Sequence, residues 1–236
     1  MKRTVAIHQP NFFPWLGYFD KIMRSDVFIL LDDAQYQKTG GSWANRVKLL
    51  INGDGQWVTA PVKRNFHGTR KINEMVFSDK YDWRGKILKT IVTEYKRAYY
   101  FDEAFSIIQP LVMNPEANVA EYNIYAIKTL ATQIGCPCRL FFRSSDFSTD
   151  LTATERLIEL TKHVGGSHYL CGGGAAGYQD DKAFQKSGIN LVYQNFLHPT
   201  YPQVVLKDFL AGLSVLDALM NVGIDRARQM MHQDNA

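Results

Sequence analysis

The 236-residue chain has few cysteines, no long apolar run and no large excess of one charge. Its cysteines, Cys136, Cys138 and Cys171, are too few for a disulfide framework, and no second pair of Cys or His residues completes a zinc site. No stretch approaches the roughly 20 apolar residues of a membrane span, and the apolar segment near the N-terminus is too short for a signal peptide. We therefore expect a cytoplasmic protein without a membrane span.

Charge is nearly balanced, with 27 basic and 23 acidic residues and a formal net charge of +4. These charges are scattered, so they indicate a mild preference for anionic ligands and no need for a nucleic-acid partner. One basic cluster is predicted to be a solvated loop, with phosphate contact as the alternative; it comprises Lys63, Arg64, His67, Arg70 and Lys71. A hydrophobic content of 46% is sufficient for a sizeable core, and we expect one α/β domain over residues 1–236.

Strand and helix patterns alternate along the sequence. Strands are predicted at residues 4–8, 27–31, 138–143, 168–171 and 190–195, with a hairpin at 47–51 and 56–60. Helices are predicted at residues 15–23, 152–164 and 181–186, within a helical segment at 82–134, and in a C-terminal helical portion at 206–231. The first-turn spacing of Thr152 and Glu155 is that of a capping box. This alternation predicts a mostly parallel sheet with flanking helices and right-handed crossovers.

The first strand runs directly into polar and aromatic residues, which is the layout of a ligand-binding loop between a strand and a helix. His8 and Gln9 stand at the end of the strand, where an imidazole can act as an acid or base or bind a phosphate. A structural hydrogen bond is the alternative for His8. Trp15 and Tyr18, on either side of Gly17, are candidates to contact a base or sugar ring, or else core residues.

Two carboxylates, Asp32 and Asp33, follow the second strand, and alternation would point only one of them inward. They are candidate catalytic groups with His8, because neighbouring carboxylates can hold an amine, a hydroxyl or hydrated Mg²⁺; the alternative is a turn or a helix cap. Three residues further along are candidates for binding phosphate or carboxylate groups: Asn45, Arg46 and Lys48. The alternative is that they are ordinary surface residues.

A run of glycines comes directly after the strand at 168–171, where a ligand could approach the backbone closely. The candidate binding residues of this segment are Gly172, Gly173, Gly174 and Tyr178. The run matches neither the dinucleotide fingerprint nor the Walker loop, and a flexible turn is the alternative. Further along the chain, Tyr201, Gln203 and Asp217 are candidate binding residues in largely apolar surroundings. They are expected to form hydrogen bonds with the body of the protein or to line a pocket.

Five motifs together carry a resemblance to a known family. They are His8-Gln9-Pro10, Pro14-Trp15-Leu16-Gly17-Tyr18, Tyr169-Leu170-x-Gly172, Tyr201-Pro202-Gln203 and Leu213-Ser214-x-Leu216-Asp217. Over nearly the whole chain, the sequence resembles the WbqC-like protein family. That family is often associated with gene clusters for O-antigen and other surface polysaccharides, so the resemblance implies a place in such a pathway.

The N-terminal strand, loop and helix start are also similar to the nucleotidylyltransferase and pantothenate-synthetase group, which implies a Rossmann-like (HUP-like) fold. Those enzymes bind ATP at a His-x-Gly-His motif, whereas the matching stretch here reads Trp15-Leu16-Gly17-Tyr18 and lacks both histidines. Stabilisation of a nucleotide phosphate would then fall to His8, Arg46 or Lys48. ATP and Mg²⁺ stay open as cofactors.

The leading hypothesis is an aminoacyl or acyl transferase, or an amide ligase, of surface-polysaccharide synthesis. It would acylate the amino group of a nucleotide-linked amino sugar with an amino acid such as glycine. Its partners would be these small molecules. Two alternatives are a non-catalytic protein that binds a nucleotide sugar and an assembly partner in a polysaccharide complex.

Overall fold

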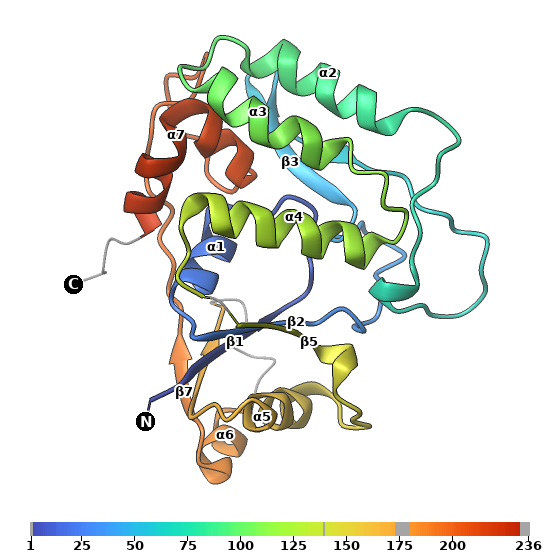
Figure 1. Cartoon of the computed structure of the whole chain (residues 1–236), viewed down its shortest axis with the longest axis vertical. Coiled ribbons are helices and arrows are strands. Elements are labelled where there is room, and N and C mark those ends of the chain that lie inside the picture. Colours follow the sequence, from blue (N-terminus) through green and yellow to red (C-terminus); the bar gives the residue numbers. More distant parts are fainter. Residues whose placement is uncertain (1, 139, 173–179, 232–236) are drawn as a thin grey trace.

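A parallel sheet forms the centre of the protein in the computed structural model, which describes residues 2–138, 140–172 and 180–231 (Figure 1). Its five strands are β1 (Thr4–His8), β2 (Val27–Leu30), β5 (Leu140–Arg143), β6 (His168–Cys171) and β7 (Asn190–Tyr193). Every neighbouring pair in this sheet is parallel. The α/β, Rossmann-like fold predicted from the alternation is therefore confirmed.

The strand order is β5-β2-β1-β6-β7, so successive strands are added first on one side of β1 and then on the other. It moves outward from β1 to β2 and β5, and then returns to place β6 against the other side of β1. The switch point lies between β1 and β6, where Val5 pairs with Tyr169 and Ala6 with Leu170. In open α/β sheets, ligands bind at this point, outside the carboxyl ends of the strands.

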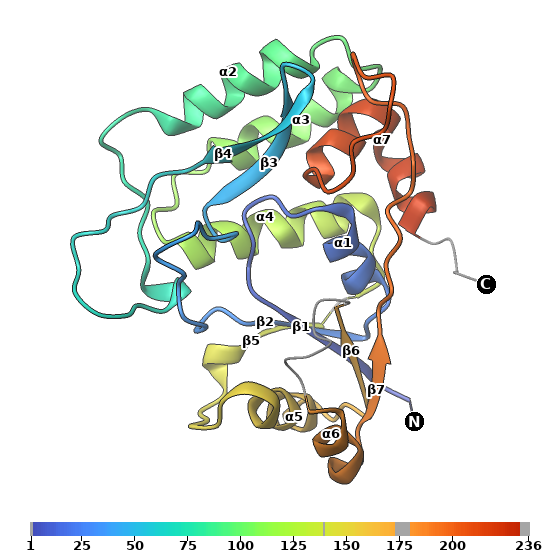
Figure 2. The same ribbon diagram turned by 180° about the vertical axis from the view of Figure 1, so that it is seen from behind.

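Helices cover both faces of the sheet (Figures 1 and 2). On one face lie α5 (Ala153–His163) and α6 (Asp181–Ser187), which pack on Val5 and Ile7 of β1. On the other lie α1 (Leu16–Met23) and α4 (Val119–Ile134), in the core that contains Ala6. Because side chains alternate along a strand, His8 projects toward the same face as Ala6, beside α1.

A second layer lies beyond α1 and α4 (Figure 2). It contains the antiparallel hairpin of β3 (Arg46–Ile51) and β4 (Asp54–Thr59), together with α2 (Trp83–Tyr95), α3 (Phe101–Val112) and α7 (Val215–Met231). Two single 3-10 turns complete the secondary structure of the described residues, at η1 (Ile72–Glu74) and η2 (Ser144–Asp146). The large core of the protein fills the space between this layer and the sheet.

Two local predictions were wrong. The C-terminal helix begins at Val215 rather than at residue 206, because the preceding segment includes Gly212 at φ +78° and Val205 at φ +61°, both left-handed. The predicted capping box is also absent: the side chain of Thr152 makes no cap hydrogen bond, and Ala153 has φ +48°. With the first helical residue in a left-handed conformation, Thr152 cannot reach the first-turn N–H groups.

Candidate functional site

A cleft of about 560 Å³ opens at the switch point. The loop after β1 and the helix α1 contribute His8, Trp15, Gly17, Tyr18 and Lys21. The ends of β6 and β7 and the chain beyond them contribute Tyr169, Gly172, Gln194, Asn195, Phe196 and His198. The described residues that line this cleft include no carboxylate.

His8 is held against α1 by aromatic contacts and a backbone hydrogen bond. Its ring centroid lies 4.7 Å from that of Tyr18 and 5.8 Å from that of Trp15. His8 Nδ1 lies 3.2 Å from Gln9 O, which also accepts a hydrogen bond from the Tyr18 hydroxyl at 3.0 Å. Burial and the nearby Lys21 lower the pKa of His8 to about 3, so the ring is neutral at pH 7. With Nδ1–H donating to a carbonyl, Nε2 is left as an acceptor.

Lys21 is a buried cation at the floor of the cleft. Its side chain is 3% exposed, and Nζ donates a hydrogen bond to Ile7 O at 2.9 Å. None of the ion pairs within the described part of the chain includes Lys21. Burial lowers the pKa of Lys21 to about 8, so the ammonium form still prevails at pH 7. A buried charge without a carboxylate is costly, and an anionic ligand would remove that cost.

The segment after β7 crosses the outer side of α1 and forms the second wall. Gln194 Nε2 donates to Gly17 O at 2.6 Å and to Asp20 Oδ2 at 2.7 Å. Arg24 Nη1 donates to Gln194 O at 2.6 Å and lies 3.5 Å from Asp20 Oδ2. Every residue of α1 is buried, including the charged Asp20 and Lys21.

Gly17 allows this wall to approach the helix. A Cβ at this position would lie 2.7 Å from Phe196 Cδ1 and 2.7 Å from Trp15 Nε1, closer than real contacts allow. We expect Gly17→Ala to destabilise the protein by about 1–3 kcal/mol, as overpacking does, and to weaken ligand binding at the cleft. Thermal unfolding measures the stability, and calorimetric titration with UDP measures the affinity. Gly68→Ala is the comparison for backbone strain without overpacking, because a Cβ at Gly68 would have no atom within 4 Å and its cost comes only from the φ of +75°. It should leave the affinity for UDP unchanged, and unchanged stability and affinity in Gly17→Ala would contradict the packing argument.

His198 contributes a second neutral imidazole to the cleft. Its Nε2 accepts the backbone N–H of Gly212 at 3.2 Å, and burial lowers its pKa. The proton of the neutral ring is therefore on Nδ1. That nitrogen is buried and has no hydrogen-bond partner among the described residues. It is available to donate to a ligand oxygen.

The two predicted carboxylates lie on the β5 side of the sheet and do not line the cleft. Asp32 is 1% exposed and accepts hydrogen bonds from Ser145 N at 3.0 Å and Ser145 Oγ at 2.7 Å. Asp33 accepts from Ser144 and forms an ion pair with Arg156. Burial opposes ionisation of Asp33, but these hydrogen bonds prevail and lower its pKa. Both groups join β2 to the chain after β5, and their catalytic role stays a prediction.

The three candidates at the start of β3 have separate surroundings. Asn45 is buried, accepts from the Tyr36 hydroxyl at 2.9 Å and donates to Ala60 O at 2.7 Å. The Arg46 guanidinium stacks 4.1 Å from the ring centroid of Trp57. Lys48 pairs across the hairpin with Trp57. Arg46 and Lys48 are both half-buried cations beside the exposed Trp57, and the Arg46 guanidinium stacks on its ring.

Of the predicted glycine loop, Gly172 lines the cleft together with His8, whereas Gly173, Gly174 and Tyr178 lie outside the described residues. The C-terminal candidates form a buried network beneath α7 instead. Asp217 Oδ2 accepts from the Tyr201 hydroxyl at 2.7 Å and from Gln203 Nε2 at 2.9 Å. Burial raises the pKa of Asp217, against the effect of these hydrogen bonds. These hydrogen bonds connect α7 to the segment that precedes it, and a role of the three residues in ligand binding stays a prediction.

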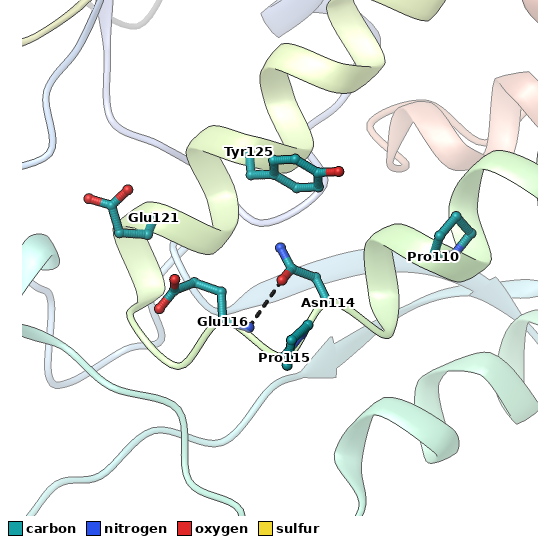
Figure 3. Close-up of a pocket in the computed structure, with 6 residues that line it drawn as sticks. All are labelled: Pro110, Asn114, Pro115, Glu116, Glu121 and Tyr125. Carbon is teal, nitrogen blue, oxygen red and sulfur yellow. Dashed lines mark hydrogen bonds between the residues drawn. The ribbon is translucent and has the colours of Figure 1, made fainter.

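One other hollow differs from the switch-point cleft in its chemistry, because its charged groups are carboxylates. This hollow of about 400 Å³ lies between the end of α3 and the start of α4 (Figure 3). Its carboxylates already have partners, because Glu121 pairs with Arg143 and Glu116 accepts the backbone N–H of Asn118 at 2.7 Å. Among the described residues, no group of three or more His, Cys, Asp or Glu side chains gathers to hold a metal ion. No helix in the described ranges has the length and apolar character to cross a bilayer.

Comparison with known proteins decides the family. The family model described as "WbqC-like protein family" matches residues 9–229. This chain belongs to the WbqC-like protein family. A relative in Mycobacterium tuberculosis (strain ATCC 25618 / H37Rv), named "Uncharacterized protein Rv1507c", is 30% identical over 226 residues, which cover 94% of this chain and 95% of that protein. No solved structure matches the chain significantly.

Sequence reasoning missed Lys21, Gln194, Phe196 and His198 as members of the cleft. The pattern of α1 is that of a helix with one apolar face, which places Lys21 toward solvent. The segment at 194–198 carries no motif that links it to the N-terminus. One signal was present. Asn195, Phe196 and His198 stand at and after the end of a predicted strand, and ligands collect at that edge of the sheet.

Proposed function

We propose that this protein binds a nucleotide-linked amino sugar at the switch-point cleft and acylates its amino group with an amino acid such as glycine, in surface-polysaccharide (O-antigen) synthesis. The observation that carries the proposal is Lys21, a buried ammonium in a cleft whose described lining has no carboxylate. A diphosphate or carboxylate would be its natural counter-ion. The link to surface polysaccharides is what the resemblance to the WbqC-like family implies.

Amide formation needs an activated acid, and ATP is the co-substrate in this proposal. The amino-acid carboxylate attacks the α-phosphate, pyrophosphate leaves, and an acyl-adenylate forms. The sugar amine then bonds to the acyl carbon while the bond from that carbon to the AMP oxygen breaks. AMP leaves with the electron pair, and the amine proton passes to water.

His8 would orient the amine in this reaction. Its Nε2 is an acceptor, and a pKa of about 3 means that the ring accepts a hydrogen bond without retaining the proton. Lys21 and the Nδ1–H of His198 would face the phosphates. Each of these groups is fixed by contacts within the protein, which favours positioning of the reactants.

A second candidate function is a non-catalytic protein that binds a nucleotide sugar. The saturation of Asp32 and Asp33 by Ser145, Ser144 and Arg156 favours it, because neither carboxylate is left free to act as a base. The weak basicity of His8 points the same way. Turnover distinguishes the two candidates.

The test combines binding with product analysis. Purified protein is incubated with ATP, an amino-acid mixture and UDP-glucosamine, and the products are identified by mass spectrometry. The enzyme should release AMP and an aminoacylated sugar, and His8→Ala should lower kcat about 100-fold, as loss of a group that orients the reacting amine does. His67→Ala, in the exposed basic loop, is the matched control. Binding without product favours the non-catalytic candidate, and neither binding nor product contradicts both.

A further inference from the structure

Three of the four tryptophans of the chain lie next to one another. The ring centroid of Trp43 lies 5.4 Å from that of Trp15 and 4.8 Å from that of Trp57. Trp43 is 41% exposed and Trp57 is 40% exposed, whereas Trp83 is buried. Large aromatic surface of this kind is costly to leave in water, and on monomeric proteins it often marks a binding site.

This aromatic group continues the wall of the switch-point cleft. Trp15 lines the cleft, and its ring contacts both the ring of His8 and that of Trp43. A ligand that enters the cleft can therefore extend along an unbroken series of rings from His8 to Trp57. We call the outer part of this series, formed by Trp43, Trp57 and Arg46, the tryptophan platform.

The platform is held by regular backbone interactions. Trp57 belongs to β4 and pairs with Lys48 of β3. The carbonyl of Trp43 accepts the N–H of Phe12 at 2.8 Å, which fixes it to the loop after β1. Both indoles are thus positioned by backbone, although they face solvent. Aromatic rings that are already held in position lose little conformational entropy when a ligand stacks on them.

Arg46 adds a cation with unused hydrogen-bonding capacity. Its guanidinium stacks on Trp57, and its Nε is buried without a partner among the described residues. Gly41, at φ +83°, makes room for it, since a Cβ there would lie 2.0 Å from Arg46 Nη1. A planar guanidinium held in this way can donate to hydroxyl or phosphate oxygens of a ligand.

We propose that the tryptophan platform is the subsite for the sugar ring of the nucleotide-linked substrate, with its phosphates in the cleft beside Lys21. This inference rests on the proposed function. The planes of Trp43 and Trp57 meet at 80°, so together they offer a face and an edge to one ligand. A puckered pyranose ring has apolar C–H groups to contact both, whereas a flat base stacks on a single face. Arg46 would donate to the sugar hydroxyls.

The test compares a ligand that carries a sugar with one that does not. Affinities for UDP-glucosamine and for UDP are measured by calorimetry with the intact protein, Trp43→Ala and Trp57→Ala. Each substitution should weaken UDP-glucosamine about tenfold and leave UDP unchanged, and Trp43→Phe should restore part of the loss. Tyr99→Ala, which removes an aromatic ring that is 87% exposed outside the platform, is the matched control.

Three outcomes would overturn the inference. An equal loss of affinity for both ligands would mean that the platform takes the base rather than the sugar. Unchanged affinity for UDP-glucosamine in both variants would mean that it takes neither. Failure of the unsubstituted protein to bind UDP-glucosamine and UDP at all would overturn the proposed function as well, so the two failures are distinguishable.

Discussion

Lys21→Met is expected to weaken the binding of UDP at the switch-point cleft by about 100-fold, since a hydrogen bond to a charged group contributes about 1.5–3 kcal/mol. The ligand-free variant should be at least as stable as the original protein at pH 7, because replacing a buried ammonium that has no carboxylate partner among the described residues with an apolar side chain removes a desolvation cost. Calorimetry gives the affinity and thermal unfolding gives the stability.

The pH dependence supplies a second measurement for the same residue. The pKa of Lys21 is lowered from 10.5 to about 8, so above pH 8 the free protein has lost this proton and an anion must restore it on binding. The affinity for UDP should therefore fall about fivefold between pH 8 and pH 9, while in Lys21→Met it should not change. Between pH 8 and 10.5 the unfolded chain binds more protons, so stability of the ligand-free protein rises with pH through this window.

Lys128→Met is the matched control, because Lys128 is an exposed lysine on α4. Its affinity for UDP should equal that of the original protein at every pH. Equal weakening in both lysine variants would indicate a general charge effect, and no weakening in Lys21→Met would remove the basis of the proposed site.

Asp217→Ala is expected to lower the free energy of unfolding by about 3 kcal/mol, because buried Tyr201 and Gln203 both lose their acceptor. For a chain of this size, that corresponds to a fall in Tm of about 6–12 °C. Calorimetric unfolding measures it. Asp225→Ala, in the part of α7 beyond the kink at Gly223 and 81% exposed at its side chain, should change Tm little.

The raised pKa of Asp217 also predicts the direction in which the stability of the protein changes with pH. The folded state holds the proton more tightly than the unfolded state, so stability from this group is complete below the ordinary pKa of 3.8 and is lost as pH rises through the folded value. The stability of the original protein relative to Asp217→Asn should therefore decrease between pH 4 and pH 7. An increase over that range would contradict the direction of the shift.

The sequence was sufficient to predict the sheet, because its strands are short apolar runs that each stop at a polar residue or a turn. It also placed His8 and Gly172 at one edge, and both line the same cleft. Parallel strands end at a common edge, so this proximity follows from the strand alternation alone.

What the sequence could not supply was the covering of α1. Its pattern gives Lys21 a solvent-facing position, whereas in the structure its Nζ donates to Ile7 O of β1, in the cleft whose second wall includes Gln194. Contacts between residues 177 positions apart leave no periodic signal in either segment. Likewise, two adjacent aspartates were candidate catalytic groups or else part of a turn or cap, and the serines that donate to them lie in η2, more than a hundred residues later.

This long separation bears on when the protein becomes able to bind. During synthesis, β1 and α1 emerge from the ribosome early, whereas Gln194 and His198 emerge only after most of the chain. Before then, the cleft lacks the wall that Gln194, Phe196 and His198 supply, so water reaches Lys21 and weakens its attraction for an anion. A nascent chain is therefore unable to capture its ligand, and recognition begins only when the last strand of the sheet has docked.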